Sequence, residues 1–243
     1  MAAHFNIADM YEIVADKVPT REALVCGEQR ATYGQLEQRA NQLAHYLASQ
    51  GVVAGDHVGL YMYNCNEYLE GMLACFKLRA VPINVNFRYV GEELLYIFQN
   101  SNMVACIHHR EFAPHIAVTL PSAQTMKALV YIDDDSATDT GNIPTVEYES
   151  ALRAQDGRRD FSERADDDLF ILYTGGTTGM PKGVMWPHKS VFFAAMGGGG
   201  WFHPDGAITE AEQIATRVAD FPIIGIALAP LMHGACWWYA CIQ

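Results

Sequence analysis

The residues best suited to chemistry lie in one stretch, 173–183, which reads Tyr-Thr-Gly-Gly-Thr-Thr-Gly-Met-Pro-Lys-Gly and follows the apolar run 169–172. It contains four glycines, three threonines and one lysine. Glycine lets backbone N–H groups approach anionic oxygens, and successive amides form a concave anion site. Because hydroxyls can reach phosphate or Mg²⁺ and lysine adds a positive charge, this composition predicts a loop that holds a triphosphate.

The stretch differs from the commoner nucleotide-binding loops. The G-x-x-x-x-G-K-[ST] pattern requires a glycine before its lysine, whereas Lys182 follows Pro181. The dinucleotide pattern G-x-G-x-x-G also fails, because Gly175, Gly176 and Gly179 have other spacings. The loop therefore belongs to another class of phosphate site.

The charge balance narrows the possible partners. The chain has 243 residues, a net charge of −12 and 18% charged residues. This acidity argues against nucleic acid, which proteins bind by placing Lys and Arg on phosphates. Between Arg164 and Lys189 the only lysine or arginine is Lys182, so positive charge is concentrated in the loop.

Composition also bears on location. Half of the residues are hydrophobic, as in globular proteins. The longest apolar run, 221–232, is interrupted by two prolines and a glycine and is too short to span a membrane. Asp9 and Glu12 interrupt the first apolar stretch, which argues against a signal peptide. The sequence predicts a soluble, cytoplasmic protein without a membrane span.

The segments expected to position the loop alternate between helical and strand periodicity. Thr32 and Gln35 form a capping box for a helix that Gly51 can end in the left-handed conformation. Strands that alternate with helices indicate an α/β fold with a largely parallel sheet flanked by helices. Further helices are expected at 67–78 and 91–99, and strands at 57–63, 81–85, 104–108, 128–132, 169–173 and 223–229.

The composition divides the chain into three parts. Residues 133–168 are rich in polar residues and begin and end with three aspartates. We interpret them as a surface connection with solvated ends rather than a metal site. It joins an N-terminal lobe, 1–132, to a phosphate-loop segment, 169–243.

Cysteine and histidine patterns predict no further site. The six cysteines include no C-x-x-C pair and lie in apolar surroundings, as reduced core cysteines do. His108 and His109 have no acidic or thiol partner at metal-ligand spacing. We therefore expect them to be a surface pair rather than metal ligands.

The loop resembles the signature of the adenylate-forming (AMP-binding) enzyme family, which includes acyl-CoA synthetases, firefly luciferase and peptide-synthetase adenylation domains. That signature runs Tyr-Thr-[Ser/Thr/Gly]-Gly-Thr-Thr-Gly-x-Pro-Lys-Gly, and residues 173–183 match it throughout. Residues 229–234, Ala-Pro-Leu-Met-His-Gly, resemble the family's Pro-[Leu/Met]-x-His motif. Gly234 follows His233 directly, whereas two residues usually separate this histidine from a glycine, which leaves the shape of the acyl pocket open.

The narrower resemblance is to fatty-acyl-CoA ligases. Residues 84–89 and 184–186 are similar to theirs, particularly in the bacterial subset that activates bulky acids such as sterol side chains. The resemblance implies that a carboxylate attacks the α-phosphorus of Mg·ATP, that pyrophosphate leaves, and that CoA then displaces AMP to give a thioester. ATP, Mg²⁺, CoA and a carboxylic acid are the implied cofactors and partners.

The resemblance also assigns roles to residues. Lys182 would offset the charge of departing pyrophosphate, Thr174 would help to ligate Mg²⁺, and His233 would line the carboxylate site. Lys182 and His233 are thus the expected catalytic residues. The implied phosphate-binding set is Thr174, Gly175, Gly176, Thr177, Thr178, Gly179 and Lys182.

The sequence ends at Gln243, before the family's Tyr-Gly-x-Thr-Glu motif, its ribose-binding aspartate and its small C-terminal domain with a catalytic lysine. It is therefore expected to be the N-terminal part of the AMP-binding domain, an incomplete fold with little activity alone. Alternatives are a carrier-protein adenylating or luciferase-like member, and a non-catalytic half-protein that binds or scaffolds. The apolar stretch 236–241 predicts self-association through surface left without partners.

Overall fold

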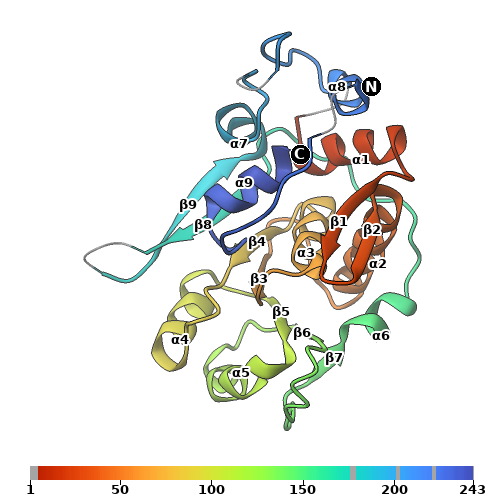
Figure 1. The fold of residues 1–243 in the computed structure, drawn as a ribbon. Coiled ribbons are helices and arrows are strands. Elements are labelled where there is room, and N and C mark those ends of the chain that lie inside the picture. The colour runs from red at the N-terminus through yellow and green to blue at the C-terminus, as the bar shows by residue number, and fades with distance from the viewer. Residues whose placement is uncertain (1–4, 176–178, 201–202, 221–222, 243) are drawn as a thin grey trace.

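The computed structural model describes residues 5–175, 179–200, 203–220 and 223–242 (Figure 1). Its centre is a seven-stranded sheet in the order β7, β6, β5, β3, β4, β8, β9. Neighbouring strands are parallel except β8 and β9, which are antiparallel. The expected α/β architecture with a largely parallel sheet is confirmed.

Strands alternate with helices along most of the chain, as the sequence periodicity predicts. The strands are β1 (Glu22–Cys26), β2 (Gln29–Thr32), β3 (His57–Tyr61), β4 (Val81–Asn84), β5 (Ala105–His109), β6 (Ala128–Ile132), β7 (Thr145–Glu147), β8 (Leu169–Thr174) and β9 (Lys182–Pro187). The helices are α1 (Ile7–Lys17), α2 (Tyr33–Ser49), α3 (Asn66–Lys77), α4 (Gly91–Asn100), η1 (Arg110–Phe112), α5 (Ala113–Thr119), η2 (Leu120–Ser122), α6 (Tyr148–Arg153), α7 (His188–Ala195), α8 (Gln213–Asp220) and α9 (Gly234–Ile242).

Helices cover both faces of the sheet. Along β5, Ala105 and Ile107 join one hydrophobic cluster, while Cys106 between them joins another, because successive strand side chains point to opposite faces. The first cluster takes buried residues from α1, α2, α3, α6, α7 and α9, and the second from α4 and α5. The sheet is therefore the middle layer of three.

Local sequence signals explain where α2 begins and ends. The Thr32 side chain accepts a hydrogen bond from the Gln35 amide, and the Gln35 side chain accepts one from the Thr32 amide, so the capping box is present. Gly51 has φ = +85°, which a glycine adopts without strain. Both predictions are confirmed.

A buried ion network joins α1, α2 and α3. The Lys77 side chain is fully buried, and its Nζ lies 2.6 Å from Glu12 Oε1 and 2.8 Å from Glu37 Oε1. Arg159 also pairs with Glu37, and Arg164 pairs with Glu12. The arginines come from residues 154–168, so this stretch is bound to the helical layer.

Other expectations for 133–168 and for the cysteines are modified. The stretch contributes β7, which pairs with β6, and α6, which packs on α2. Asp168 is largely buried and pairs with Arg79, so the aspartates at this end are not simply solvated. All six cysteines are free, but Cys26 is exposed, so not every one is a core cysteine.

The strand expected at 223–229 is wrong. These residues form no strand, and Ile224, Ile226 and Leu228 are 98%, 67% and 86% exposed. The run is apolar enough for a strand, but within the described residues no neighbouring strand pairs with it. Among the helices that the structure describes, none is long and apolar enough to cross a membrane.

Candidate functional site

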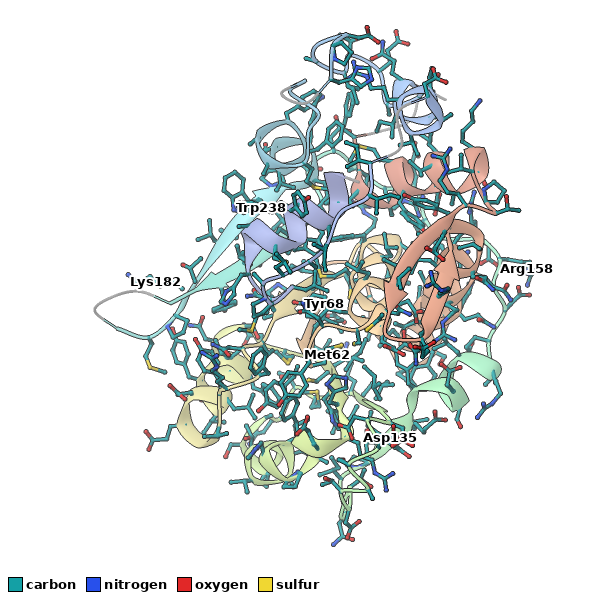
Figure 2. The ribbon with its side chains drawn as sticks, viewed as in Figure 1. Met62, Tyr68, Asp135, Arg158, Lys182 and Trp238 are labelled. Atoms are coloured by element: carbon teal, nitrogen blue, oxygen red, sulfur yellow. The ribbon has the colours of Figure 1, made fainter. Side chains whose placement is uncertain are left out.

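The signature stretch forms a hairpin at one edge of the sheet. β8 and β9 pair in register, with Thr174 opposite Lys182 and Tyr173 opposite Gly183. The hairpin extends beyond the other strands (Figure 1), and Figure 2 shows Lys182 where β9 leaves the connecting loop. Strand pairing therefore brings together the hydroxyl and the ammonium group that the sequence placed at opposite ends of the loop.

The described loop residues are open to solvent. Thr174, Gly175, Gly179 and Lys182 are exposed, and a Cβ built on either glycine would meet no atom within 4 Å. Among the described residues, no carboxylate lies within ion-pair distance of Lys182. This open backbone with one unpaired cation fits an anionic ligand. Gly176, Thr177 and Thr178 lie outside the described residues.

Helix α4 braces the hairpin from both strands. The Tyr96 hydroxyl donates to the Pro181 carbonyl at 3.0 Å, and the Tyr173 hydroxyl donates to Asn100 Oδ1 at 2.7 Å. The first bond holds the loop just before Lys182, and the second holds the strand just before Thr174. Sequence reasoning missed this brace, because no periodic pattern distinguishes a bracing tyrosine from a core tyrosine.

Two asparagines hold the segment that leads to His233. Asn64 donates to the Ala229 carbonyl at 2.9 Å and accepts from the Leu231 amide at 2.7 Å. Asn84, the last residue of β4, donates to the Met232 carbonyl at 2.6 Å. His233 follows at once and is exposed. The motif therefore lies at the carboxyl edge of the sheet, where ligands bind in open α/β folds.

Asn84 also binds the phosphate-loop strand. Its Nδ2 lies 3.3 Å from the Tyr173 carbonyl oxygen, and its Oδ1 accepts from the Tyr173 amide at 2.8 Å. The side-chain amide of Asn84 thus binds both Tyr173 and Met232. Thr174 follows the first of these residues in the chain, and His233 follows the second. The structure thus brings the two predicted halves of the site together. The only signal in the sequence is that Asn84 is a polar residue one position before the end of the predicted strand 81–85.

Close packing explains why a glycine directly follows His233. A Cβ there would lie 2.5 Å from Leu172 Cδ2 and 3.1 Å from Trp238 Cζ2. A side chain at position 234 would therefore force the Leu172 side chain of β8 to move. Trp238 in turn meets Trp186 of β9 edge to face, with ring centroids 6.0 Å apart, so Trp186 packs between elements of the protein.

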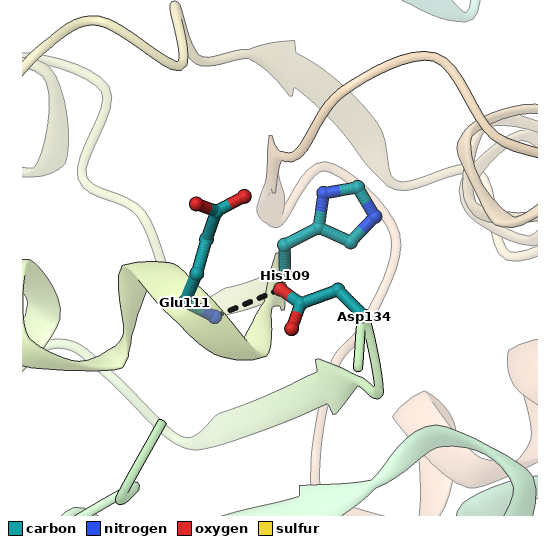
Figure 3. A group of neighbouring side chains, drawn as sticks. All are labelled: His109, Glu111 and Asp134. Atoms are coloured by element: carbon teal, nitrogen blue, oxygen red, sulfur yellow. Dashed lines mark hydrogen bonds between the residues drawn. The ribbon is translucent and has the colours of Figure 1, made fainter. Parts of the chain in front are cut away.

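The expected surface pair His108–His109 is wrong. Both side chains are buried, at 0% and 7% exposure, because they end β5 in the middle of the sheet. Burial lowers the pKa of His108 to about 4 and lowers that of His109 as well. His109 also has acidic neighbours that the spacing argument did not find, Glu111 and Asp134 (Figure 3).

Two of the atoms that His109 and Asp134 could offer to a metal ion already accept backbone hydrogen bonds. The ligand-type atoms of His109, Glu111 and Asp134 lie within 4.8 Å of one another. However, His109 Nδ1 accepts a hydrogen bond from the Tyr63 amide at 3.1 Å, and Asp134 accepts one from the Glu111 amide at 2.8 Å. A neutral imidazole nitrogen has one lone pair, so Nδ1 has none left for a metal ion.

Comparison with known proteins agrees with the geometry of the hairpin. Residues 11–241 match the model of the AMP-binding enzyme family. The chain belongs to the AMP-binding enzyme family. The resemblance found in the sequence is thereby confirmed, and the β8–β9 hairpin carries this family's signature.

Among AMP-binding relatives, the 3-oxocholest-4-en-26-oate–CoA ligase of Rhodococcus rhodochrous is 47% identical over 96% of this chain and 42% of the ligase. A medium/long-chain-fatty-acid–CoA/3-oxocholest-4-en-26-oate–CoA ligase of Mycobacterium marinum is 44% identical over 97% of this chain and 44% of its own length. The chain thus spans less than half the length of both relatives.

A solved structure supports the fold. The N-terminal domain of FACL13 from Mycobacterium tuberculosis, determined with an inhibitor bound, superposes with a TM-score of 0.72. It is 26% identical, and the match covers all of this chain and 55% of the other. The α/β architecture of this chain is therefore similar to that of the FACL13 N-terminal domain.

Proposed function

We propose that this chain supplies the triphosphate-binding and acid-binding parts of an ATP-dependent acyl-CoA ligase. The observation that carries the proposal is the exposed β8–β9 hairpin, in which Lys182 lies opposite Thr174 and pairs with no carboxylate among the described residues. In an acidic chain, a solvent-facing lysine beside glycine amides favours a polyanionic ligand.

The proposed substrate is a fatty or bulky carboxylic acid, with sterol side-chain acids included. This rests on two relatives above 40% identity, whose names specify fatty acids or 3-oxocholest-4-en-26-oate. The acid's carboxylate would attack the α-phosphorus of ATP with loss of pyrophosphate, and the CoA thiol would then displace AMP. Both displacements depend on alignment and on neutralised phosphate charge.

Each residue of the site has a proposed task. Amides of the loop glycines would hold the β- and γ-phosphates, and Lys182 would offset the charge on departing pyrophosphate. Bound Mg²⁺ would neutralise phosphate oxygens, with Thr174 helping to hold it. His233, exposed at the carboxyl edge, would line the acid's carboxylate site.

Two further parts of the proposal concern organisation and location. We propose that the chain divides into a lobe at 1–132, a connection at 133–168 and a phosphate-loop segment at 169–243, all within one AMP-binding domain.

We also place the protein in the cytoplasm, because its six cysteines are all free, as is usual in a reducing compartment.

A chimera tests the proposal. This chain would replace the matching 42% of the Rhodococcus rhodochrous ligase, and AMP formation would be measured with ATP, CoA and either fatty or sterol side-chain acids. We expect acid-dependent AMP formation, reduced about 10²-fold by Lys182→Ala. The control is Lys17→Ala, which removes an exposed lysine of α1. A folded chimera that releases neither pyrophosphate nor AMP would favour a binding or scaffolding role. Acid-dependent pyrophosphate release without AMP formation would favour a carrier-protein adenylating or luciferase-like member.

A further inference from the structure

Asn84 occupies a gap in the sheet. Strands β4 and β8 share a single ladder pair, Ile83 with Ile171, whereas β3 and β4 share four pairs. Beyond Ile171, the Asn84 side chain binds both the N–H and the C=O of Tyr173. A primary amide offers the same donor and acceptor as a peptide group, so this side chain takes the place of the next ladder residue.

The same side chain reaches the acid-side motif. Its Nδ2 donates to Tyr173 and, over the shorter distance of 2.6 Å, to the Met232 carbonyl. The Asn84 side chain is nearly buried, at 8% exposure, so little water competes for these bonds. Since consecutive Cα atoms are about 3.8 Å apart, Thr174 and His233 are both held one residue away from this amide.

We propose that Asn84 is a positioning residue that couples the phosphate loop to His233, so that anion binding at the hairpin is sensed at the acid site. This inference rests on the proposed function, because the two sites that Asn84 would couple are the proposed triphosphate and carboxylate sites. Asn84 itself acts through the Tyr173 and Met232 backbones.

Asn64 provides a comparison within the same molecule. It binds the motif through Ala229 and Leu231, as Asn84 does through Met232, but within the described residues no hydrogen bond joins its side chain to β8. Asn64 should therefore fix the motif alone, and only Asn84 should connect the motif with the loop.

The matched variants are Asn84→Asp and Asn64→Asp. Each keeps the size and the acceptor of the side chain but removes its two N–H donors. In Asn84→Asp, a carboxylate oxygen would face the carbonyls of Met232 and Tyr173 and repel both. In Asn64→Asp, a repulsion weakened by solvent would act only on the Ala229 carbonyl, because Asn64 is exposed.

Amide hydrogen exchange of the free chain tests the connection without any ligand. We expect Asn84→Asp to accelerate exchange at least about tenfold in peptides covering both 170–175 and 230–236, because lost buried bonds permit local opening. Asn64→Asp should accelerate only 230–236. Unchanged exchange at 170–175 in Asn84→Asp, or equal loosening of both segments by Asn64→Asp, would overturn the proposal.

The histidine NMR spectrum tests transmission. The Cε1–H signal of His233, assigned with His233→Gln, should shift when MgATP is added to the wild-type chain and to Asn64→Asp. In Asn84→Asp it should stay in place even at saturating MgATP, and a shift equal to that of the wild type would refute coupling. If calorimetry detects no MgATP binding to any of the three proteins, the proposed function fails, while the exchange comparison still decides whether Asn84 joins the two segments.

Discussion

The Asn84 side chain donates a 2.6 Å hydrogen bond to the backbone carbonyl of Met232, 148 positions later in the chain. The same side chain binds Tyr173 of β8, so it connects the histidine motif with the strand that carries the glycine-rich signature. Two patterns that are separate in the sequence therefore meet at the carboxyl edge of β4 and β8.

Replacing Gly234 should destabilise the contact between α9 and β8. In Gly234→Ala the new Cβ would lie 2.5 Å from Leu172 Cδ2, and overpacking of this kind costs about 1–3 kcal/mol. Urea denaturation measures the loss. Gly175→Ala is the matched control, since a Cβ there meets nothing within 4 Å; equal stability of the two variants would contradict the packing described.

Lys77 should contribute more to stability than an exposed cation. Lys77→Met leaves the buried carboxylate of Glu37 without one of its partners, and breaking a buried pair costs about 3–5 kcal/mol. The exposed pair Arg30–Glu22 serves for comparison, since Arg30→Met should cost less than about 1 kcal/mol. Chemical denaturation at neutral pH should rank the variants in this order, and the reverse ranking would contradict it.

Mild acid should destabilise the protein through two buried histidines. Burial lowers the pKa of His108 and that of His188 to about 4 in the folded chain, whereas an unfolded histidine titrates near 6.5. Between these values the unfolded chain binds more protons, so stability falls as the pH decreases from about 6.5 to 4. Each histidine contributes up to about 1.4 kcal/mol per pH unit.

Urea midpoints at pH 7.0 and 5.0 measure this effect. His108→Gln should flatten the dependence, because glutamine keeps hydrogen-bonding capacity but does not titrate. A midpoint that is independent of pH in the wild-type protein would show that neither histidine is buried in its neutral form.

Self-association is still expected, but through the exposed apolar run 223–229 and not through 236–241, where Cys236 and Trp237 are buried. Ile224, Ile226 and Leu228 expose most of their surface within a few residues, and such patches favour association. Light scattering at tens of micromolar, roughly where exposed patches begin to aggregate proteins, should detect oligomers. Ile226→Lys should reduce them, whereas Val118→Lys, at a lone exposed valine on α5, should not. A monodisperse wild-type monomer would contradict this prediction.

The sequence predicted the elements whose signals are local. The capping box at Thr32 and Gln35 and the left-handed Gly51 were predicted from a few adjacent residues. The strand 128–132 was predicted with the bounds it has, because its apolar residues are bounded by polar ones. The residues from Thr174 to Lys182 were predicted to bind phosphate from their composition and from the family resemblance, and this stays a prediction.

Features that depend on distant partners could not be predicted. The run 223–229 has a strand's composition, but strand formation also requires a neighbouring strand. His108 is polar, yet its place in the central strand β5 buries it. The Asn84 side chain binds Tyr173 and Met232, which lie 89 and 148 positions away in the chain, so no local pattern marks its role.

The central claim is that the hairpin binds the phosphates of ATP, and calorimetry with the purified chain tests it most directly. MgATP or magnesium tripolyphosphate would be titrated into the wild-type protein, Lys182→Ala and Lys17→Ala. We predict saturable binding to the wild type and to Lys17→Ala, and affinity at least about tenfold weaker for Lys182→Ala, because one charge-assisted contact is lost. No binding to the wild type, or equal affinity in all three proteins, would contradict the account.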